Sequence, residues 1–128
     1  MMDKLPEPDY IYKAQVLRVV DGDTYEMRVD VGFRFEAHMP LRLAHVDAPE
    51  RYTKAGKAVT QLVSDMLGSL PASVVVKTYK PEDPEDKYGR YLAEVYFMGQ
   101  KVAQGVIDLA QYLLANGLAA PYEGGKRP

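Results

Sequence analysis

The 128-residue chain contains no cysteine and only two histidines, His38 and His45. The lack of cysteine excludes disulfide bonds, a thiolate nucleophile, a zinc ribbon and an iron–sulfur cluster. Two histidines are too few for the multi-histidine sites that transition metals favour. Any metal would have to be held by oxygen or imidazole ligands, which leaves carboxylates as the ligand class to look for.

The chain also lacks a long apolar run and a strong excess of one charge. No segment approaches the roughly 18 apolar residues of a membrane-spanning helix, and the start, MMDKLPEPDY, is acidic and proline-rich, unlike a signal peptide. We therefore expect a cytoplasmic protein with no membrane partner. Sixteen basic against 18 acidic residues give a net charge of −2. A nucleic-acid partner would thus have to be recognised at a local basic site.

Length and composition are those of one ordinary folded domain. A domain takes roughly 100–200 residues, and 47% hydrophobic with 27% charged residues is close to the average of soluble proteins. The chain shows no internal repeat and no interdomain linker. We expect a single domain over residues 1–128, with residues 1–9 and 123–128 flexible.

Apolar periodicity predicts five strands and two helices. Three successive strands are predicted over residues 11–20, 25–31 and 33–46, with turns at 21–23 and at Gly32. A helix is predicted over 54–70, with Ala58 on its inner face, because apolar residues recur at spacings of three and four until Pro71. It is followed by a strand over 73–79, a charged loop over 80–87, a strand over 88–97 and a turn at Met98-Gly99. A second helix is predicted over 104–116, with Val106 pointing inward, and ends at Gly117.

The order strand–strand–strand–helix–strand–strand–helix predicts a mainly β fold with helices, of the α+β class. A five-stranded OB-fold barrel is the best match, because both its strand count and its helix after the third strand agree. Other five-stranded barrels also fit the periodicity.

Two stretches carry pairs of carboxylates, and the second also contains an arginine. Asp21-Gly22-Asp23-Thr24 places two aspartates in a tight turn, where ordinary turn chemistry also explains them. In the stretch 41–50, alternation puts Arg42 on the strand face opposite to Leu41 and Leu43, so that it points into solvent or into a pocket.

The carboxylates of Asp47 and Glu50 are separated by a turn that Pro49 makes rigid. Two such neighbours repel each other unless a cation or a shared proton relieves them. A structural alternative is that Asp47 caps the turn and Glu50 begins the following helix, where acidic residues are favoured.

A third stretch, Asp86-Lys87-Tyr88-Gly89-Arg90, joins basic and aromatic residues. Arginine makes two-pronged contacts with phosphate, and a tyrosine hydroxyl can bond to a phosphate oxygen. The alternative is a loop closed by ion pairs of Arg90 with nearby acids, namely Glu82, Asp83 or Glu85. Together, the three stretches have the oxygen ligands, base and cations that metal-assisted phosphodiester hydrolysis needs.

The chain resembles the staphylococcal nuclease family, also called the thermonuclease or micrococcal nuclease family. The matching segments follow one another in the family's order over roughly residues 11–122. They are Val20-Asp21-Gly22-Asp23-Thr24, Leu41-Arg42-Leu43, Val46-Asp47-Ala48-Pro49-Glu50, Asp86-Lys87-Tyr88-Gly89-Arg90 and Asn116-Gly117-Leu118-Ala119. The family's fold is an OB barrel with helices, in agreement with the pattern of strands.

The resemblance implies a role for each matching residue. Asp23 and Asp47 match the family's calcium-binding carboxylates, and Ala48 matches a position that offers its backbone carbonyl. Glu50 matches the general base for the attacking water, while Arg42 and Arg90 match the arginines that hold the reacting phosphate. The remaining matches are substrate contacts: Lys87 and Tyr88 to phosphate, and Tyr122 to a base.

The implied activity is that of a Ca²⁺-dependent endo- and exonuclease. It would cleave DNA and RNA at the 5′ P–O bond with little sequence specificity. We expect single-stranded substrates to be preferred, a monomer, and an origin in a phage or plasmid. The alternative is an inactive OB-fold module that binds single-stranded nucleic acid or a protein partner. Against it, such a module does not need three carboxylates with two arginines, because clustered acids repel phosphate.

Overall fold

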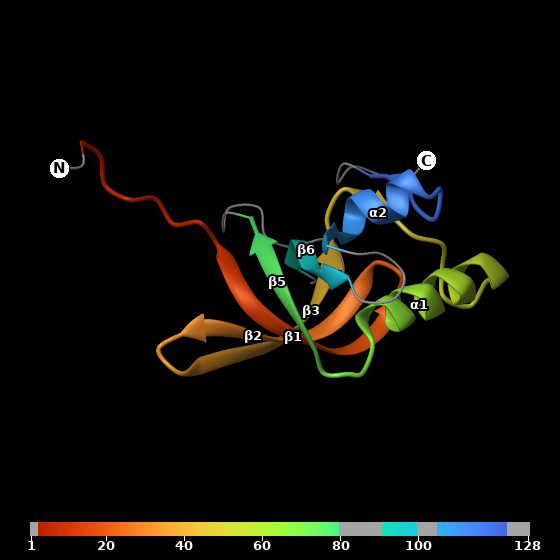
Figure 1. Cartoon of the computed structure of the whole chain (residues 1–128), viewed down its shortest axis with the longest axis horizontal. Helices are drawn as coiled ribbons and strands as arrows, with labels where there is room; N and C mark the ends of the chain where they lie inside the picture. Colours follow the sequence, from red (N-terminus) through yellow and green to blue (C-terminus); the bar gives the residue numbers. More distant parts are fainter. Residues whose placement is uncertain (1–2, 80–90, 100–104, 123–128) are drawn as a thin grey trace.

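A curved sheet of six strands dominates the computed structural model, which describes residues 3–79, 91–99 and 105–122 (Figure 1). The strands are β1 (Ile11–Asp21), β2 (Thr24–Gly32), β3 (Phe35–Leu43), β5 (Ala72–Thr78), β6 (Tyr91–Gly99) and β7 (Gly105–Asp108). They lie in the order β3-β2-β1-β5-β6-β7, and every neighbouring pair is antiparallel.

A further pairing closes five of these strands into a ring. β3 and β6 run parallel, with Leu41 opposite Tyr91 and Leu43 opposite Ala93. The ring β1-β2-β3-β6-β5 confirms the predicted OB-type arrangement, and β7 extends it at one edge.

The shorter elements lie around this ring. β4 (Val46–Asp47) pairs with β8 (Ala120–Pro121) in a separate two-stranded sheet. α1 (Lys54–Leu67) follows β4, and α2 (Leu109–Ala115) follows β7. In Figure 1 both helices lie at the right, while the β2–β3 hairpin projects to the left. Neither helix, in the part of the chain that the structure describes, is long and apolar enough to cross a membrane.

The core fills the ring because apolar side chains alternate along its strands. In β2, Tyr25, Met27 and Val29 are buried. Helix α1 adds a buried face of residues spaced three, four and seven apart, which covers one end of the barrel. That face consists of Gly56, Val59, Val63, Met66 and Leu67.

Several predicted boundaries are wrong. The strand predicted over 33–46 ends at Leu43 and resumes only at Val46, because His45 has a φ of 74° and interrupts the extended backbone. The helix predicted over 54–70 ends at Leu67, with Gly68 at a φ of 81°. Ala58, expected on its inner face, is exposed.

In the C-terminal part of the chain, the observed elements differ more from the predicted ones. Residues 105–108 of the predicted helix form strand β7 against β6, and α2 begins only at Leu109. Sheet pairing outweighs helix periodicity here, and Val106, expected to point inward, is 73% exposed. Met98 and Gly99 belong to β6 and not to a turn. Gly117 has the left-handed φ of 68° that was expected at a helix end. The predicted loop over 80–87 lies outside the described residues.

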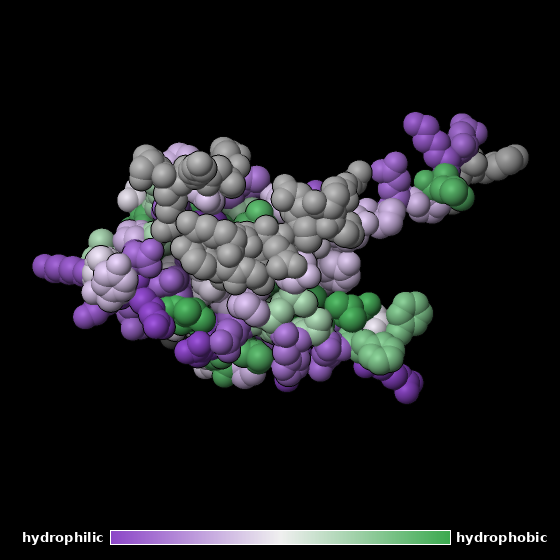
Figure 2. Space-filling view, turned by 180° about the vertical axis from the view of Figure 1, so that it is seen from behind, coloured by the Kyte–Doolittle hydropathy of each residue, from purple (hydrophilic) through white to green (hydrophobic). Residues whose placement is uncertain are grey.

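Two exposed segments lie far from the helices. Residues 3–9 are exposed and extend away from the barrel (Figure 1). The tip of the β2–β3 hairpin carries Phe33 and Phe35, which are 93% and 68% exposed. Figure 2 shows this tip as a green projection at the right of the molecule.

Candidate functional site

The predicted site residues on described segments lie where the β1–β2 turn meets the segment after β3. The backbone N–H of Leu43 donates to the Asp23 carbonyl at 2.8 Å. The next residue, Ala44, donates to the Ala93 carbonyl of β6, also at 2.8 Å. The turn, the end of β3 and β6 are therefore held together by main-chain hydrogen bonds.

Asp23 is a buried carboxylate, only 4% exposed. Its Oδ2 accepts a hydrogen bond from the backbone N–H of Ala48 at 2.9 Å, and its Oδ1 accepts one from the Thr24 hydroxyl at 3.1 Å. A buried charge needs such partners, because losing its hydration is costly. The bond to Ala48 joins residues 25 positions apart.

Arg42 lies beside Asp23 and is 2% exposed. Its Nη2 is 3.5 Å from Asp23 Oδ2 and 3.3 Å from Asp47 Oδ1, and its Nη1 donates to the Leu43 carbonyl at 3.2 Å. The Tyr122 ring lies over the guanidinium, with its centroid 4.7 Å from Cζ. Of the two predicted orientations, Arg42 therefore takes the one that points into a pocket.

The turn before Asp23 packs closely because Gly22 has no side chain. A Cβ atom at this position would lie 2.6 Å from Val59 Cγ1 and 3.0 Å from the Ala48 Cβ. The carbonyl of Gly22 accepts a hydrogen bond from the hydroxyl of Tyr25. Burial raises the pKa of Tyr25 well above its ordinary value, and the charge of Asp23 raises it further.

The loop that carries Glu50 is fixed by the start of α1. The Glu50 carbonyl accepts hydrogen bonds from the N–H and the hydroxyl of Thr53 at 3.0 and 2.7 Å. Thr53 also caps the helix, since its hydroxyl accepts from the Gly56 N–H at 3.0 Å. A Cβ atom on Gly56 would lie 1.7 Å from the Glu50 carbonyl oxygen, so only glycine fits at this position.

Carboxylates crowd one side of the site. Burial raises the pKa of Asp21, and the negative charges of Asp23 and Glu50 raise it further. Asp21 Oδ1 accepts the backbone N–H of Arg51 at 3.0 Å, which partly offsets this rise. Among the described residues, no group of three or more Asp, Glu, His or Cys is arranged to hold a metal. A cation there would also need backbone oxygens or other ligands.

The structure brings together Asp23, Arg42, Asp47, Ala48 and Tyr122, and it places Glu50 within electrostatic reach of Asp21. The other three predicted residues, Lys87, Tyr88 and Arg90, lie outside the described residues, as do the predicted ion pairs of Arg90.

Residue type and spacing assign no role to three contributors to the site. In the sequence, Asp21 is a turn residue within a segment that matches the family, Tyr25 is part of a strand, and Gly56 is a glycine inside a helix. Simple turn chemistry does not account for Asp21 and Asp23, because both accept hydrogen bonds from residues beyond β3. Glu50 does not begin the helix, which starts after Thr53.

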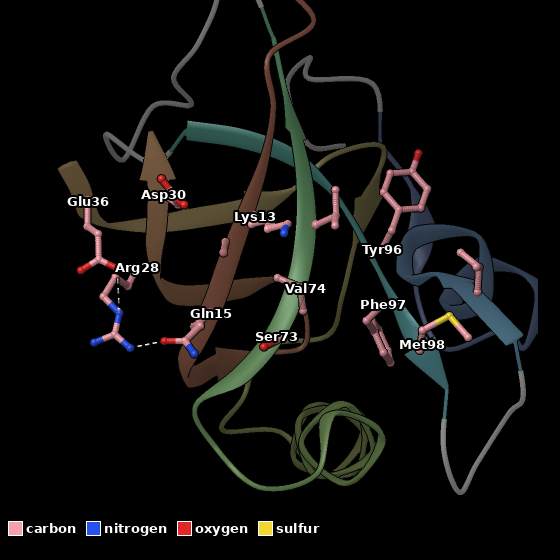
Figure 3. A pocket seen from close by; sticks show the side chains of 13 residues that line it. Lys13, Gln15, Arg28, Asp30, Glu36, Ser73, Val74, Tyr96, Phe97 and Met98 are labelled. Atoms are coloured by element: carbon pink, nitrogen blue, oxygen red, sulfur yellow. Dashed lines mark hydrogen bonds and ion pairs between the residues drawn. The ribbon is translucent and has the colours of Figure 1, made fainter. Parts of the chain in front are cut away.

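A second concave region lies on the outer face of the barrel (Figure 3). It is an open groove of about 640 Å³ formed by side chains of β1, β2, β3, β5, β6 and β7. Arg28 projects into it and donates to the Gln15 side chain, while its Nε lies 3.5 Å from Glu36 Oε2. No predicted site residue lines this groove.

Comparison with known proteins gives a consistent set of relatives. The family model described as "Staphylococcal nuclease homologue" matches residues 40–127. An "Uncharacterized endonuclease" of Escherichia coli O157:H7 is 34% identical over 111 residues, which are 86% of this chain and 61% of the relative. A "Micrococcal nuclease" of Shigella flexneri is 31% identical over 85 residues, which are 66% of this chain and 42% of the relative. The chain thus spans about three fifths of the first relative and less of the second.

Proposed function

The chain belongs to the family of staphylococcal nuclease homologues, and on that premise we propose that it is a nuclease that hydrolyses phosphodiester bonds of DNA and RNA. The observation that carries the proposal is the burial of Arg42 with two carboxylates, Asp23 and Asp47, within 3.5 Å of one guanidinium nitrogen. A buried guanidinium beside the buried carboxylate of Asp23 and the partly buried carboxylate of Asp47 is expensive to maintain, which favours a functional over a structural origin.

We propose Ca²⁺ as the cofactor, held by the carboxylates of Asp23 and Asp47 and by the backbone carbonyl of Ala48. All three are hard oxygen donors, the ligand type that Ca²⁺ prefers. The rise that Asp23 and Glu50 cause in the pKa of Asp21 supports the proposal, because crowded carboxylates favour a cation among them. When bound, the cation would supply Lewis-acid polarisation of a phosphoryl oxygen.

The protein's own groups perform the remaining chemistry. Glu50, exposed at the rim of the site, takes a proton from the attacking water. Arg42 and Arg90 stabilise the charge that grows on the phosphate in the transition state, so losing either lowers turnover more than binding. Lys87 and Tyr88 contact the phosphate in this proposal.

Tyr122 supplies an aromatic face beside Arg42. Stacking on a tyrosine tolerates every base, and it requires bases that are not paired in a duplex. We therefore propose weak sequence preference and a preference for single strands. We also propose a monomer, and cleavage at the 5′ P–O bond as the family resemblance implies.

Degradation of labelled single-stranded DNA, single-stranded RNA and duplex DNA, with Ca²⁺ or with a chelator, tests the proposal. We expect calcium-dependent cleavage, fastest on single strands and abolished by Glu50→Gln. Glu36→Gln is the matched control, because Glu36 is an exposed carboxylate in the outer groove. A folded protein that binds single strands yet cleaves none with any divalent ion would instead be an OB-fold binding module.

A further inference from the structure

Four polar side chains form a hydrogen-bonded cluster next to the proposed active site. This His45 cluster consists of His45, Tyr79, Glu94 and Tyr96. The Tyr79 hydroxyl lies 2.6 Å from His45 Nε2 and donates to Glu94 Oε2 at 3.1 Å. Because the Tyr79 proton goes to Glu94, the His45 Nε2–H is the donor to the Tyr79 oxygen. Tyr96 donates to the other oxygen of Glu94.

The anchor of the cluster is a charged carboxylate. Burial alone would raise the pKa of Glu94, but hydrogen bonds from Tyr96 and Tyr79 and the nearby charge of Lys77 bring it below its ordinary value. Glu94 is therefore ionised at neutral pH, and hydrogen bonds to an ionised acceptor are stronger than neutral ones. Since Glu94 lies on β6, a strand of the closed ring, it ties His45 to the rigid part of the fold.

The backbone of His45 is strained. Its φ of 74° lies in the left-handed region, which residues with a Cβ rarely adopt. Glycine would adopt this conformation without cost. His45 is also half exposed, with 47% of its side chain accessible, so burial contributes little to its presence. The hydrogen bond with Tyr79 therefore accounts for an imidazole side chain at this strained position.

The strained residue joins three parts of the proposed site. It lies in the bend between Leu43, which follows Arg42 at the end of β3, and β4, which contains Asp47. Its carbonyl accepts the backbone N–H of Tyr122 at 2.8 Å, and the Tyr122 ring covers Arg42. A shift of this bend would therefore move Asp47 and Tyr122 relative to Arg42.

We propose that the His45 cluster is a positioning device that holds the bend over residues 44–47, and with it Asp47 and Tyr122, in place around Arg42. Its effect on catalysis rests on the proposed function; its effect on the bend does not. His45, Tyr79 and Glu94 act through other residues and are positioning residues.

Two variants test the cluster by removing different partners of the same hydrogen bond, the His45 imidazole or the Tyr79 hydroxyl. His45→Gly removes the imidazole and at the same time relieves the backbone strain, so simple strain would make it more stable. Tyr79→Phe removes only the hydroxyl that links His45 to Glu94. Tyr12→Phe is the matched control, since Tyr12 is a partly buried tyrosine of β1 whose hydroxyl makes no hydrogen bond with the described residues.

Amide hydrogen exchange by NMR gives a readout that needs no activity. We expect the amides of Ala44 and Tyr122 to exchange about tenfold faster in both variants, about the factor that follows from losing one hydrogen bond of the cluster. Amides of Val16 and Met27 in the barrel should keep their rates. In cleavage assays, kcat should fall by about tenfold or more while KM changes little.

Two results would overturn the inference: unchanged exchange at Ala44 and Tyr122, or faster exchange throughout the barrel, which would mean a purely structural role. Tyr12→Phe should match the wild type in every readout. A wild-type protein that cleaves no nucleic acid would refute the proposed function, and the exchange rates would still decide whether the cluster holds the bend.

Discussion

Two arginines of this protein face carboxylates at nearly the same distance in very different surroundings. Arg42 lies 3.3 and 3.5 Å from Asp47 and Asp23, and its side chain is 2% exposed. Arg28 lies 3.5 Å from Glu36 in the outer groove, where the two side chains are 32% and 54% exposed (Figure 3).

The difference shows that contact distance alone does not identify a functional ion pair. Around Arg28 both side chains are partly exposed, so water weakens the attraction between the charges and the pair is worth little, although Arg28 Nε itself is buried without a hydrogen-bond partner among the described residues. Arg42 and Asp23 have lost nearly all of their hydration, and each depends on the other, and on the partly buried Asp47, for compensation. The groove is an open hollow of about 640 Å³, but the buried cluster has the chemistry of a site.

The largest expected effect contrasts the two arginines directly. Arg42→Ala leaves Asp23 buried without its counter-charge and should lower the free energy of unfolding by about 3–5 kcal/mol, besides abolishing cleavage. Arg28→Ala should change it by no more than about 1 kcal/mol. Urea denaturation of both variants measures the contrast, which would be lost if the two effects were equal.

The second largest effect is stabilisation by Ca²⁺, which should depend on carboxylates of the candidate site and not on those of the outer groove. If Asp23 and Asp47 hold the cation, Ca²⁺ at 100 times its dissociation constant stabilises the folded state by about 2.7 kcal/mol. The rise in Tm should appear in the wild type and in Asp30→Asn, whose carboxylate lies in the groove. Asp47→Asn should show little or none. A rise that survives in Asp47→Asn would place the cation elsewhere.

A substitution at Gly56, where helix α1 packs against the backbone of Glu50, should have a smaller effect on stability. Gly56→Ala would place a methyl group 1.7 Å from the Glu50 carbonyl oxygen, so the loop must move. Such overpacking costs about 1–3 kcal/mol, and cleavage should fall as Glu50 is displaced. Lys57→Ala, an exposed change in the same helical turn, should be close to neutral. Thermal unfolding and turnover measured together would contradict this account if Gly56→Ala matched the control.

The smallest effect concerns alkaline pH. Because burial raises the pKa of Tyr25 well above its ordinary value of 10.0, the unfolded chain loses this proton first as pH rises. Stability contributed by neutral Tyr25 is thus complete below pH 10 and declines above it, by at most about 1.4 kcal/mol per pH unit. Tyr25→Phe should flatten this decline. An identical slope in chemical denaturation between pH 10 and 11 would argue against it.

The ring of five strands was predictable because alternation within each strand is a local property. In β2, the alternation of Tyr25, Met27 and Val29 with polar residues defines both the strand and its inner face. The error at residues 105–108 has a different origin. Their strand exists because they pair with β6, and a single segment carries no information about its partner.

In the candidate site, too, local sequence patterns were predictable and contacts between distant segments were not. Residue type and spacing indicated the turn of Asp23, the Pro49 loop and Arg42. His45 did not, because its left-handed backbone and its bond to Tyr79, 34 positions away, depend on how β3, β5 and β6 are arranged.

The sequence by itself determined which residue types are available: oxygen ligands without cysteine, arginines beside acids, and apolar alternation for a small barrel. Only the tertiary structure decided that Arg42 is buried beside Asp23 and Asp47 while Arg28 stays partly exposed. The physical reason is register. β2 and β3 pair Thr24 with Arg42 at the closed end of the ring, whereas Arg28 pairs with His38 further along the hairpin, where its side chain stays 32% exposed. Desolvation, which separates a functional arginine from an ordinary one, arises only when distant segments pack together.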